Sequence, residues 1–434
     1  MLLSVAPQNA VKLFSFLLYI HILRILISAR KPELDSKYIV IPLLLLPVPW
    51  ILLHIVNPDL LNSFFFVAAI CTLHDANTDR SIALSAVLLA FTCWTKYTMY
   101  PYLIVLPLLF WRRQMPFRLF VRRAFLFVVV FLMLLSPIYV RNIVLKKDPL
   151  YPLLYTVFPS DWQHKQTVAV QTEFPLPATL TEFAKRIILT PISITFQLRS
   201  YGSASEIGFL PLLGLIFLPF TFRKSNIRLL LFLFLCYLIW IHQLYHFRYF
   251  LPIYLIGSLL LAYSFQFIGM RLRRIVPVIW VLAAAYGLYI SIPVARLFPL
   301  ISTNVTREQY LSGRISYFEA AQYLNSHAKG ERTIMVGETR NAYIRAKLIP
   351  FSYTDPDPLL RWSSKVKNAE ELYRKLKQEQ VGYILYNRAE MKRLADQYGI
   401  WRASSEQNAM IAEMLRAHGK IVFSKSGAVV IRIR

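Results

Sequence analysis

Long apolar runs fill most of the first 300 residues, and they constrain the fold more than any other feature of the sequence. A helix of about 20 apolar residues crosses the hydrocarbon core of a bilayer, and shorter ones cross it when tilted or flanked by partners. The runs that qualify as candidate spans are 11–28, 39–57, 60–75, 80–95, 98–111, 124–140, 208–222, 228–245, 249–268 and 275–297. Hydrophobic residues make up 56% of the chain and charged residues only 17%, which excludes an ordinary soluble protein. The sequence therefore predicts a polytopic α-helical membrane protein with about ten spans.

Basic residues beside the apolar runs predict the orientation of the chain, because Lys and Arg in short loops stay on the cytoplasmic side. The three clear clusters begin at Arg112, Arg223 and Arg271, and two spans separate each from the next. All three therefore fall on the cytoplasmic side. The loop 141–207 and everything after about residue 298 then lie outside the cytoplasm, as does the amino terminus. An outside amino terminus without a signal peptide leads us to expect an odd number of further spans upstream.

Residues 300–434 have the composition of a soluble domain, with 22 basic and 13 acidic residues. Helical periodicity around Leu324, Leu376 and Met414 alternates with β-rich runs. Those runs are Thr333–Val336, Val381–Tyr386, Ile421–Phe423 and Val429–Ile433. We therefore expect a membrane domain over 1–299, with its outer loop at 141–207, and a small extracytoplasmic α/β domain over 300–434. Within the loop, 180–196 reads as an amphipathic helix on the membrane face, although a buried helix fits as well.

The net charge of +26 indicates an anionic membrane surface as partner. The first 300 residues hold 27 basic and 10 acidic residues, and the basic ones lie beside apolar runs. The aromatic residues lie inside those runs, which argues against nucleic-acid binding. The sequence has no Walker, dinucleotide-binding, zinc-protease or serine-esterase motif, which argues against an ATP-driven pump, a zincin and a serine esterase.

Two charged residues at predicted outer span ends are candidate site residues, since charge is costly there. Asp59 directly precedes the run 60–75. Its carboxylate could bind a metal or an acceptor hydroxyl, or simply cap the helix. Lys96 follows the run 80–95 and breaks the positive-inside pattern. A phosphate partner would explain Lys96, and so would an ammonium that snorkels to the interface.

Two further outer positions are candidates for binding an anion. Arg141 follows the run 124–140 and offers a planar fork to an oxygen anion, or acts as a cation at a helix end. His246 and Arg248 stand among aromatic residues before the run 249–268. Together with Lys96 they could hold a lipid-linked phosphate, whereas the alternative is an aromatic interface belt around one Arg.

The order of these motifs resembles the bacterial GT-C superfamily of integral-membrane glycosyltransferases, closest to its protein O-mannosyltransferase-like and aminoarabinose-transferase-like branch. The similarity covers roughly residues 10–290. It rests on Asn57-Pro58-Asp59, Thr95-Lys96-Tyr97-Thr98, Tyr139-Val140-Arg141-Asn142, Asp148-Pro149-Leu150-Tyr151-Pro152 and His246-Phe247-Arg248-Tyr249-Phe250-Leu251-Pro252. The tail, with Gly337-Glu338-Thr339-Arg340 and Asp355-Pro356-Asp357-Pro358, is similar to the extracytoplasmic domain of many bacterial members.

The resemblance implies transfer of a sugar from a polyprenyl-phosphate carrier to an envelope glycan, lipid or protein, at the outer face of the inner (plasma) membrane. In this family the principal catalytic acid lies in a first outer loop, and we expect the present chain to begin after that loop. Asp59 then matches the second acidic position. By position, we expect Lys96, Arg141 and Arg248 to contact the carrier phosphate, and His246 either assists them or makes a structural hydrogen bond. The resemblance implies no certain cofactor and leaves a divalent cation, Mg²⁺ or Mn²⁺, open.

Two alternatives to an active transferase remain at the level of sequence. A transporter of an anionic lipid-linked substrate would use the same outer cations, but such proteins usually show inverted repeats, and the sequence shows none. A non-catalytic relative or assembly partner would bind another envelope protein through its soluble domain.

Overall fold

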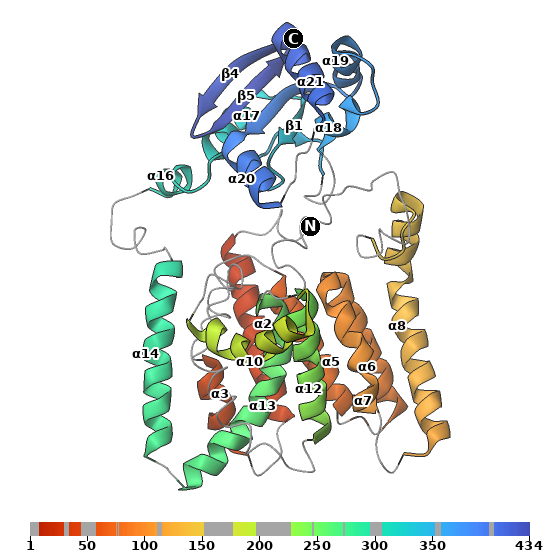
Figure 1. The fold of residues 1–434 in the computed structure, drawn as a ribbon, viewed down its shortest axis with the longest axis vertical. Helices are drawn as coiled ribbons and strands as arrows, with labels where there is room; N and C mark the ends of the chain where they lie inside the picture. The colour runs from red at the N-terminus through yellow and green to blue at the C-terminus, as the bar shows by residue number, and fades with distance from the viewer. Residues whose placement is uncertain are drawn as a thin grey trace. The chain divides into compact units, whose positions relative to one another are not determined.

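A computed structural model describes residues 8–29, 34–44, 58–74, 76, 78–110, 115–151, 177–196, 227–244, 247–271, 274–295, 306–351, 357–398 and 403–434. Contacts divide the chain into two compact units. The first comprises Met1–Val140 and Leu176–Arg296, and the second comprises Arg141–Pro175 and Leu297–Arg434. The described part of the first unit is helical, whereas the second holds a five-stranded sheet with its own helices (Figure 1).

The helices of the first unit follow the apolar runs. They are α2 (Gln8–Ser28), α3 (Lys37–Leu44), α5 (Asp59–His74), α6 (Asp79–Thr95), α7 (Pro107–Phe110), α8 (Phe117–Lys146), α10 (Leu180–Phe196), α12 (Ile227–Ile239), α13 (Phe247–Arg271) and α14 (Ile275–Ala295). A 3₁₀-helix, η1 (Tyr97–Val105), follows α6, and a π-helical turn, η4 (Trp240–Leu244), follows α12. The last residues of α8, from Arg141 on, belong to the second unit.

Two of the described helices are long and apolar enough to cross a membrane, by length and composition. They are Phe117–Leu145 and Arg248–Gln266. Four shorter apolar helices cover Leu13–Ser28, Asp59–His74, Ile227–His242 and Ile275–Gly287. The predicted span 208–222 lies outside the described residues, as does most of 39–57.

The run 98–111 does not form the single α-helical span that its apolar composition suggests. It folds instead as η1 followed by the four-residue α7. Pro101 lies inside η1 and Pro107 begins α7. Because proline has no backbone N–H and clashes with the preceding turn, it disfavours a continuous α-helix at both places.

Helices α5 and α6 of the first unit pack against each other as an antiparallel pair. The Asn62 side chain donates to the Thr92 carbonyl at 2.9 Å, and the Ser85 hydroxyl donates to the Ala69 carbonyl at 2.9 Å. Small and polar residues of this kind bring helices together where no water competes for hydrogen bonds. The pair therefore places the first residue of α5 beside the last turn of α6.

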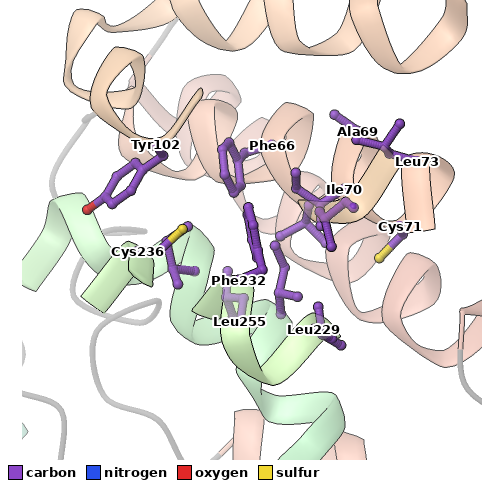
Figure 2. Packing of buried hydrophobic residues seen from close by; sticks show 14 of the residues in the cluster. Phe66, Ala69, Ile70, Cys71, Leu73, Tyr102, Leu229, Phe232, Cys236 and Leu255 are labelled. Carbon is purple, nitrogen blue, oxygen red and sulfur yellow. The ribbon is translucent and has the colours of Figure 1, made fainter. Parts of the chain in front are cut away.

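Buried apolar side chains join this pair to α12, α13 and η1 (Figure 2). Phe66 of α5, Phe232 of α12 and Leu255 of α13 are fully buried and lie together. The Tyr102 ring of η1 meets the Phe66 ring edge-on, with 6.3 Å between the centroids. This packing fixes the beginning of α13 relative to the junction of α6 and η1.

The two ends of the α5–α6 pair carry different charges. At the end where α6 begins, Asp79 pairs with Arg122 and with Arg123 of α8, the latter at 3.3 Å. At the opposite end, Asp59 lies beside Lys96. This separation agrees with the prediction that the basic residues between the runs 98–111 and 124–140 lie at the end away from Lys96.

The second unit contains the strands β1 (Arg332–Val336), β2 (Lys347–Leu348), β3 (Val381–Asn387), β4 (Gly419–Lys425) and β5 (Ala428–Ile433). Their order is β2-β1-β3-β5-β4, with β1 parallel to both β2 and β3, and with β5 antiparallel to β3 and β4. The helices are α16 (Arg307–Ser312), α17 (Phe318–His327), α18 (Pro358–Ser363), α19 (Ala369–Gln378), α20 (Arg388–Tyr398) and α21 (Ser405–His418).

Two hydrophobic clusters cover the two faces of this sheet. Ile384 of β3 packs with Leu372 and Met414, whereas its neighbours Tyr383 and Leu385 pack in the cluster of Leu324 from α17. Successive residues of a strand point to opposite faces, so the unit has three layers, with α17 on one face and α18, α19 and α21 on the other. The α/β alternation read from the sequence is present here.

Candidate functional site

Asp59 and Lys96 form an ion pair at one end of the α5–α6 pair. Asp59 is the first residue of α5 and only 3% exposed, and its Oδ1 accepts a hydrogen bond from Lys96 Nζ. Lys96 leaves the helical conformation, with φ −162° and ψ 131°, and joins α6 to η1. Its side chain is 21% exposed, so the ammonium lies in a largely dry place beside its carboxylate.

Tyr249 and Arg248, in the first turn of α13, lie beside this ion pair. Lys96 Nζ lies 4.4 Å from the centroid of the Tyr249 ring, and Arg248 Cζ lies 5.1 Å from the same centroid. Arg248 Nη2 also donates to the Tyr249 hydroxyl at 3.2 Å. We call Asp59, Lys96, Arg248 and Tyr249 the cation cluster. Three residues that are far apart in the sequence, Asp59, Lys96 and Arg248, are thus brought together.

The 3₁₀-helix η1, which begins directly after Lys96, carries polar and aromatic side chains and contacts the cation cluster through Tyr102. The Tyr102 hydroxyl donates to the Tyr249 carbonyl at 3.4 Å, and the Tyr139 hydroxyl of α8 donates to the Tyr100 hydroxyl at 3.3 Å. The Tyr97 and Tyr100 rings lie 5.8 Å apart. Within the described part of the chain, the buried Thr98 hydroxyl oxygen has no hydrogen-bond partner.

The sequence predicted two further site residues, Arg141 and His246. Arg141 is exposed near the end of α8 and belongs to the second compact unit. His246 lies outside the described residues. Tyr249 is the member of the cluster that the sequence did not single out. Its position next to Arg248 was a signal, but it stands among several aromatic residues that look alike in the sequence.

Charge balance decides what the cation cluster can hold. Lys96 and Arg248 carry two positive charges and Asp59 one negative charge, so the cluster has an excess of one positive charge. An ammonium and a guanidinium over the same ring, with excess positive charge, suit a phosphate or carboxylate oxygen.

The same residues are a poor fit for a divalent cation. Across the described ranges, no three His, Cys, Asp or Glu residues lie close enough together to hold a metal ion. The one carboxylate of the cluster is engaged by Lys96. Divalent cations of this class prefer several oxygen ligands, so we derive no chemical step through a metal here.

The comparison with known proteins gives a fold but no family. The sequence matches no protein-family model and no curated protein. Two solved structures share the fold of nearly the whole chain. The crystal structure of ArnT from Cupriavidus metallidurans in the apo state aligns with a TM-score of 0.53 at 13% identity, over 98% of this chain and 83% of ArnT.

The second similar structure is the archaeal oligosaccharyltransferase AglB from Archaeoglobus fulgidus, in complex with an inhibitory peptide and a dolichol-phosphate. It aligns with a TM-score of 0.52 at 9% identity, over 97% of this chain and 63% of AglB. The chain therefore spans less than two thirds of AglB. Both structures have the GT-C fold. The chain therefore has a GT-C-like fold, a polytopic helical membrane fold to which a small sheet is added.

Proposed function

We propose that the chain is an integral-membrane glycosyltransferase that moves a sugar from a polyprenyl-phosphate carrier to an envelope glycan, lipid or protein. One observation carries the proposal: Lys96 and Arg248 converge over Tyr249, with Asp59 beside them, at one end of the helical unit. The shared fold supports it, since ArnT and AglB are transferases and the AglB structure contains a dolichol-phosphate.

The proposed reaction breaks the bond between the sugar C1 and a phosphate oxygen, forms a bond from C1 to an acceptor hydroxyl oxygen, and releases the hydroxyl proton to water. The departing phosphate gains negative charge as this bond breaks. Cations placed where that charge develops stabilise the transition state. We assign this role to the Lys96 ammonium and the Arg248 guanidinium, with Arg141 and His246 as further proposed contacts.

Asp59 takes a supporting role in this scheme. The resemblance assigns it to an acidic position of the catalytic site, but its Oδ1 is engaged by the Lys96 ammonium. A carboxylate held in this way orients the ammonium and balances its charge before the substrate binds. We therefore propose that Asp59 positions Lys96, so that its loss acts on the reaction through Lys96.

The proposed location follows from the same charges. Basic residues retained in the cytoplasm would place the opposite end, with Asp59 and Lys96, at the outer face of the inner membrane. Membrane lipids would then surround the apolar helices, and the C-terminal domain would lie outside the cytoplasm.

The proposal is tested with the purified chain in proteoliposomes that contain synthetic polyprenyl-phosphate sugars with a radioactive sugar. Envelope lipid, glycan and protein fractions are offered separately, and both transferred label and released polyprenyl phosphate are measured. Lys96→Gln and Arg248→Gln should each lower the transfer rate about 100-fold or more, as loss of an oxyanion-stabilising donor does.

Arg122→Gln is the matched control, because Arg122 is an exposed cation at the opposite end of the same helical unit. Its transfer rate should stay near that of the wild type. Donor binding without any release of polyprenyl phosphate would favour the transporter instead. Neither binding nor release with any donor would contradict the proposal.

A further inference from the structure

We infer that Tyr249 is a positioning residue that sets the separation and direction of the two cations that contact the carrier phosphate. The inference rests on the proposed function and adds a residue to it. Tyr249 contributes no charge of its own. Its ring and its hydroxyl determine where the Lys96 ammonium and the Arg248 guanidinium can lie.

Tyr249 contacts both cations at once. Lys96 Nζ and Arg248 Cζ lie over the same ring, at 4.4 and 5.1 Å from its centroid. Both distances are within the range of about 6 Å in which an aromatic ring attracts a cation. The Tyr249 hydroxyl also accepts a hydrogen bond from Arg248 Nη2, at 3.2 Å. One side chain thus restrains both positive groups.

Such a restraint is needed because the two cations repel each other. Asp59, which is only 3% exposed, lies beside Lys96 and balances the charge of its ammonium. In a place with little water, like charges at short range act strongly on each other. The negative face of an aromatic ring attracts both groups without neutralising either. The two groups therefore keep their positive charges while the ring restrains them.

The backbone of Tyr249 is itself held in place by its surroundings. Its backbone carbonyl accepts a hydrogen bond from the Tyr102 hydroxyl at 3.4 Å, and the Tyr102 ring packs edge-on against Phe66. Tyr102 and Phe66 are fully buried. The residue whose ring contacts the cations is therefore anchored through its backbone to the core of the helical unit.

The first test measures binding of farnesyl phosphate, a short polyprenyl phosphate, to the full chain in detergent. Tyr249→Leu removes both the ring and the hydroxyl, and Tyr249→Phe removes the hydroxyl alone. We expect Tyr249→Leu to weaken binding about threefold to tenfold, and Tyr249→Phe to stay within about twofold of the wild type. In the transfer assay, Tyr249→Leu should lower kcat and raise KM together.

Phe250→Leu is the matched control for loss of an aromatic ring from the first turns of α13. The Phe250 ring stacks on Trp240, with 4.9 Å between the centroids. We expect its binding of farnesyl phosphate to equal that of the wild type. If Phe250→Leu weakens binding as much as Tyr249→Leu does, the effect is one of general packing and the inference is wrong.

A second readout needs no ligand and detects the ring beside Lys96 directly. Lysines methylated with ¹³C give separate NMR signals, and Lys96→Arg identifies the signal of Lys96. The ring current of Tyr249 should shift that signal upfield in the wild type and in Tyr249→Phe, but not in Tyr249→Leu. An unshifted signal in the wild type would overturn the inference.

The outcomes separate the inference from the proposed function. If the wild type binds farnesyl phosphate and Tyr249→Leu binds it equally well, Tyr249 is not a positioning residue and the proposed donor site stands. If the wild type does not bind farnesyl phosphate, the proposed donor site is wrong and the inference falls with it.

Discussion

At the scale of single residues, the Lys96–Asp59 pair shows how a charged group is kept inside a largely apolar unit. Each charge would be costly to bury alone, and each reduces the cost of the other. The position of each member could be predicted, because Asp59 and Lys96 both stand at the ends of apolar runs. Their contact could not be predicted, because it depends on how α5 packs against α6.

The buried pair predicts a strong and specific effect of removing one partner. Asp59→Asn leaves the Lys96 ammonium without its carboxylate and should lower the stability of the protein by about 3–5 kcal/mol. The double variant Asp59→Asn with Lys96→Gln should recover much of that loss. Thermal unfolding in detergent measures both, and Asp79→Asn, which breaks a more exposed pair, is the control.

Asp357 in the second unit predicts a pH dependence of stability. It caps α18, accepts a hydrogen bond from the Leu360 N–H at 3.0 Å, and is only 5% exposed. Burial raises the pKa of Asp357 from 3.8 to about 7. As pH rises from about 4 to 7, the unfolded chain loses this proton before the folded one does. The loss of stability that Asp357 causes is therefore small near pH 4 and reaches its full size above pH 7.

Asp357→Asn removes this titration but retains a side chain that caps helices well. Relative to the wild type, the variant should gain about 2–4 kcal/mol of stability between pH 4 and pH 8. Urea-dependent proteolysis of the C-terminal residues in the full chain measures this difference. An equal difference in stability at both pH values would contradict the assignment.

At the scale of elements, sequence patterns locate most of the described helices and strands. The bounds of α10 agree with the predicted 180–196, and α5 and α6 agree with their runs to within about one residue. The prediction of one α-helical span over 98–111 was wrong, because it rested on apolar composition alone and proline interrupts the helix there. Tyr249 was missed for a related reason, since only tertiary packing distinguishes it from the aromatic residues around it.

Two backbone carbonyls of α8 near its internal proline accept hydrogen bonds from side chains. Pro137 has no N–H to offer the Met133 carbonyl, which instead accepts a hydrogen bond from the Ser136 hydroxyl at 2.7 Å. The neighbouring Leu134 carbonyl accepts from Trp94 Nε1 at 3.0 Å, which ties α6 to α8.

Trp94→Phe keeps an aromatic ring and loses this donor, so it should lower stability by about 1 kcal/mol. Thermal unfolding measures the effect, and Phe91→Leu, a change at another exposed ring of α6, is the control. A Trp94→Phe variant as stable as the wild type would show that the hydrogen bond contributes nothing.

At the scale of the whole molecule, a strongly basic membrane domain is joined to a basic domain with a sheet. The C-terminal residues 300–434 carry 22 basic and 13 acidic residues. A surface whose net charge has one sign raises the local concentration of oppositely charged partners, and salt screens this effect. If the acceptor is an anionic glycan, the C-terminal domain would attract it.

Lys347, Lys392 and Lys420 are exposed in the second unit. Replacing all three with Gln should raise the KM for an anionic acceptor by roughly threefold to tenfold at low salt, and by much less at 0.5 M salt. The KM for the donor should not change. An unchanged acceptor KM at low salt would contradict a guiding role for this domain.

The most direct test of the central claim is an experimental structure of the chain with bound polyprenyl phosphate. The account predicts that the phosphate lies within hydrogen-bond distance of both Lys96 Nζ and the Arg248 guanidinium, beside the Tyr249 ring. A phosphate bound at the opposite end of the helical unit, near Arg122 and Asp79, would contradict it. So would a phosphate that contacts neither Lys96 nor Arg248.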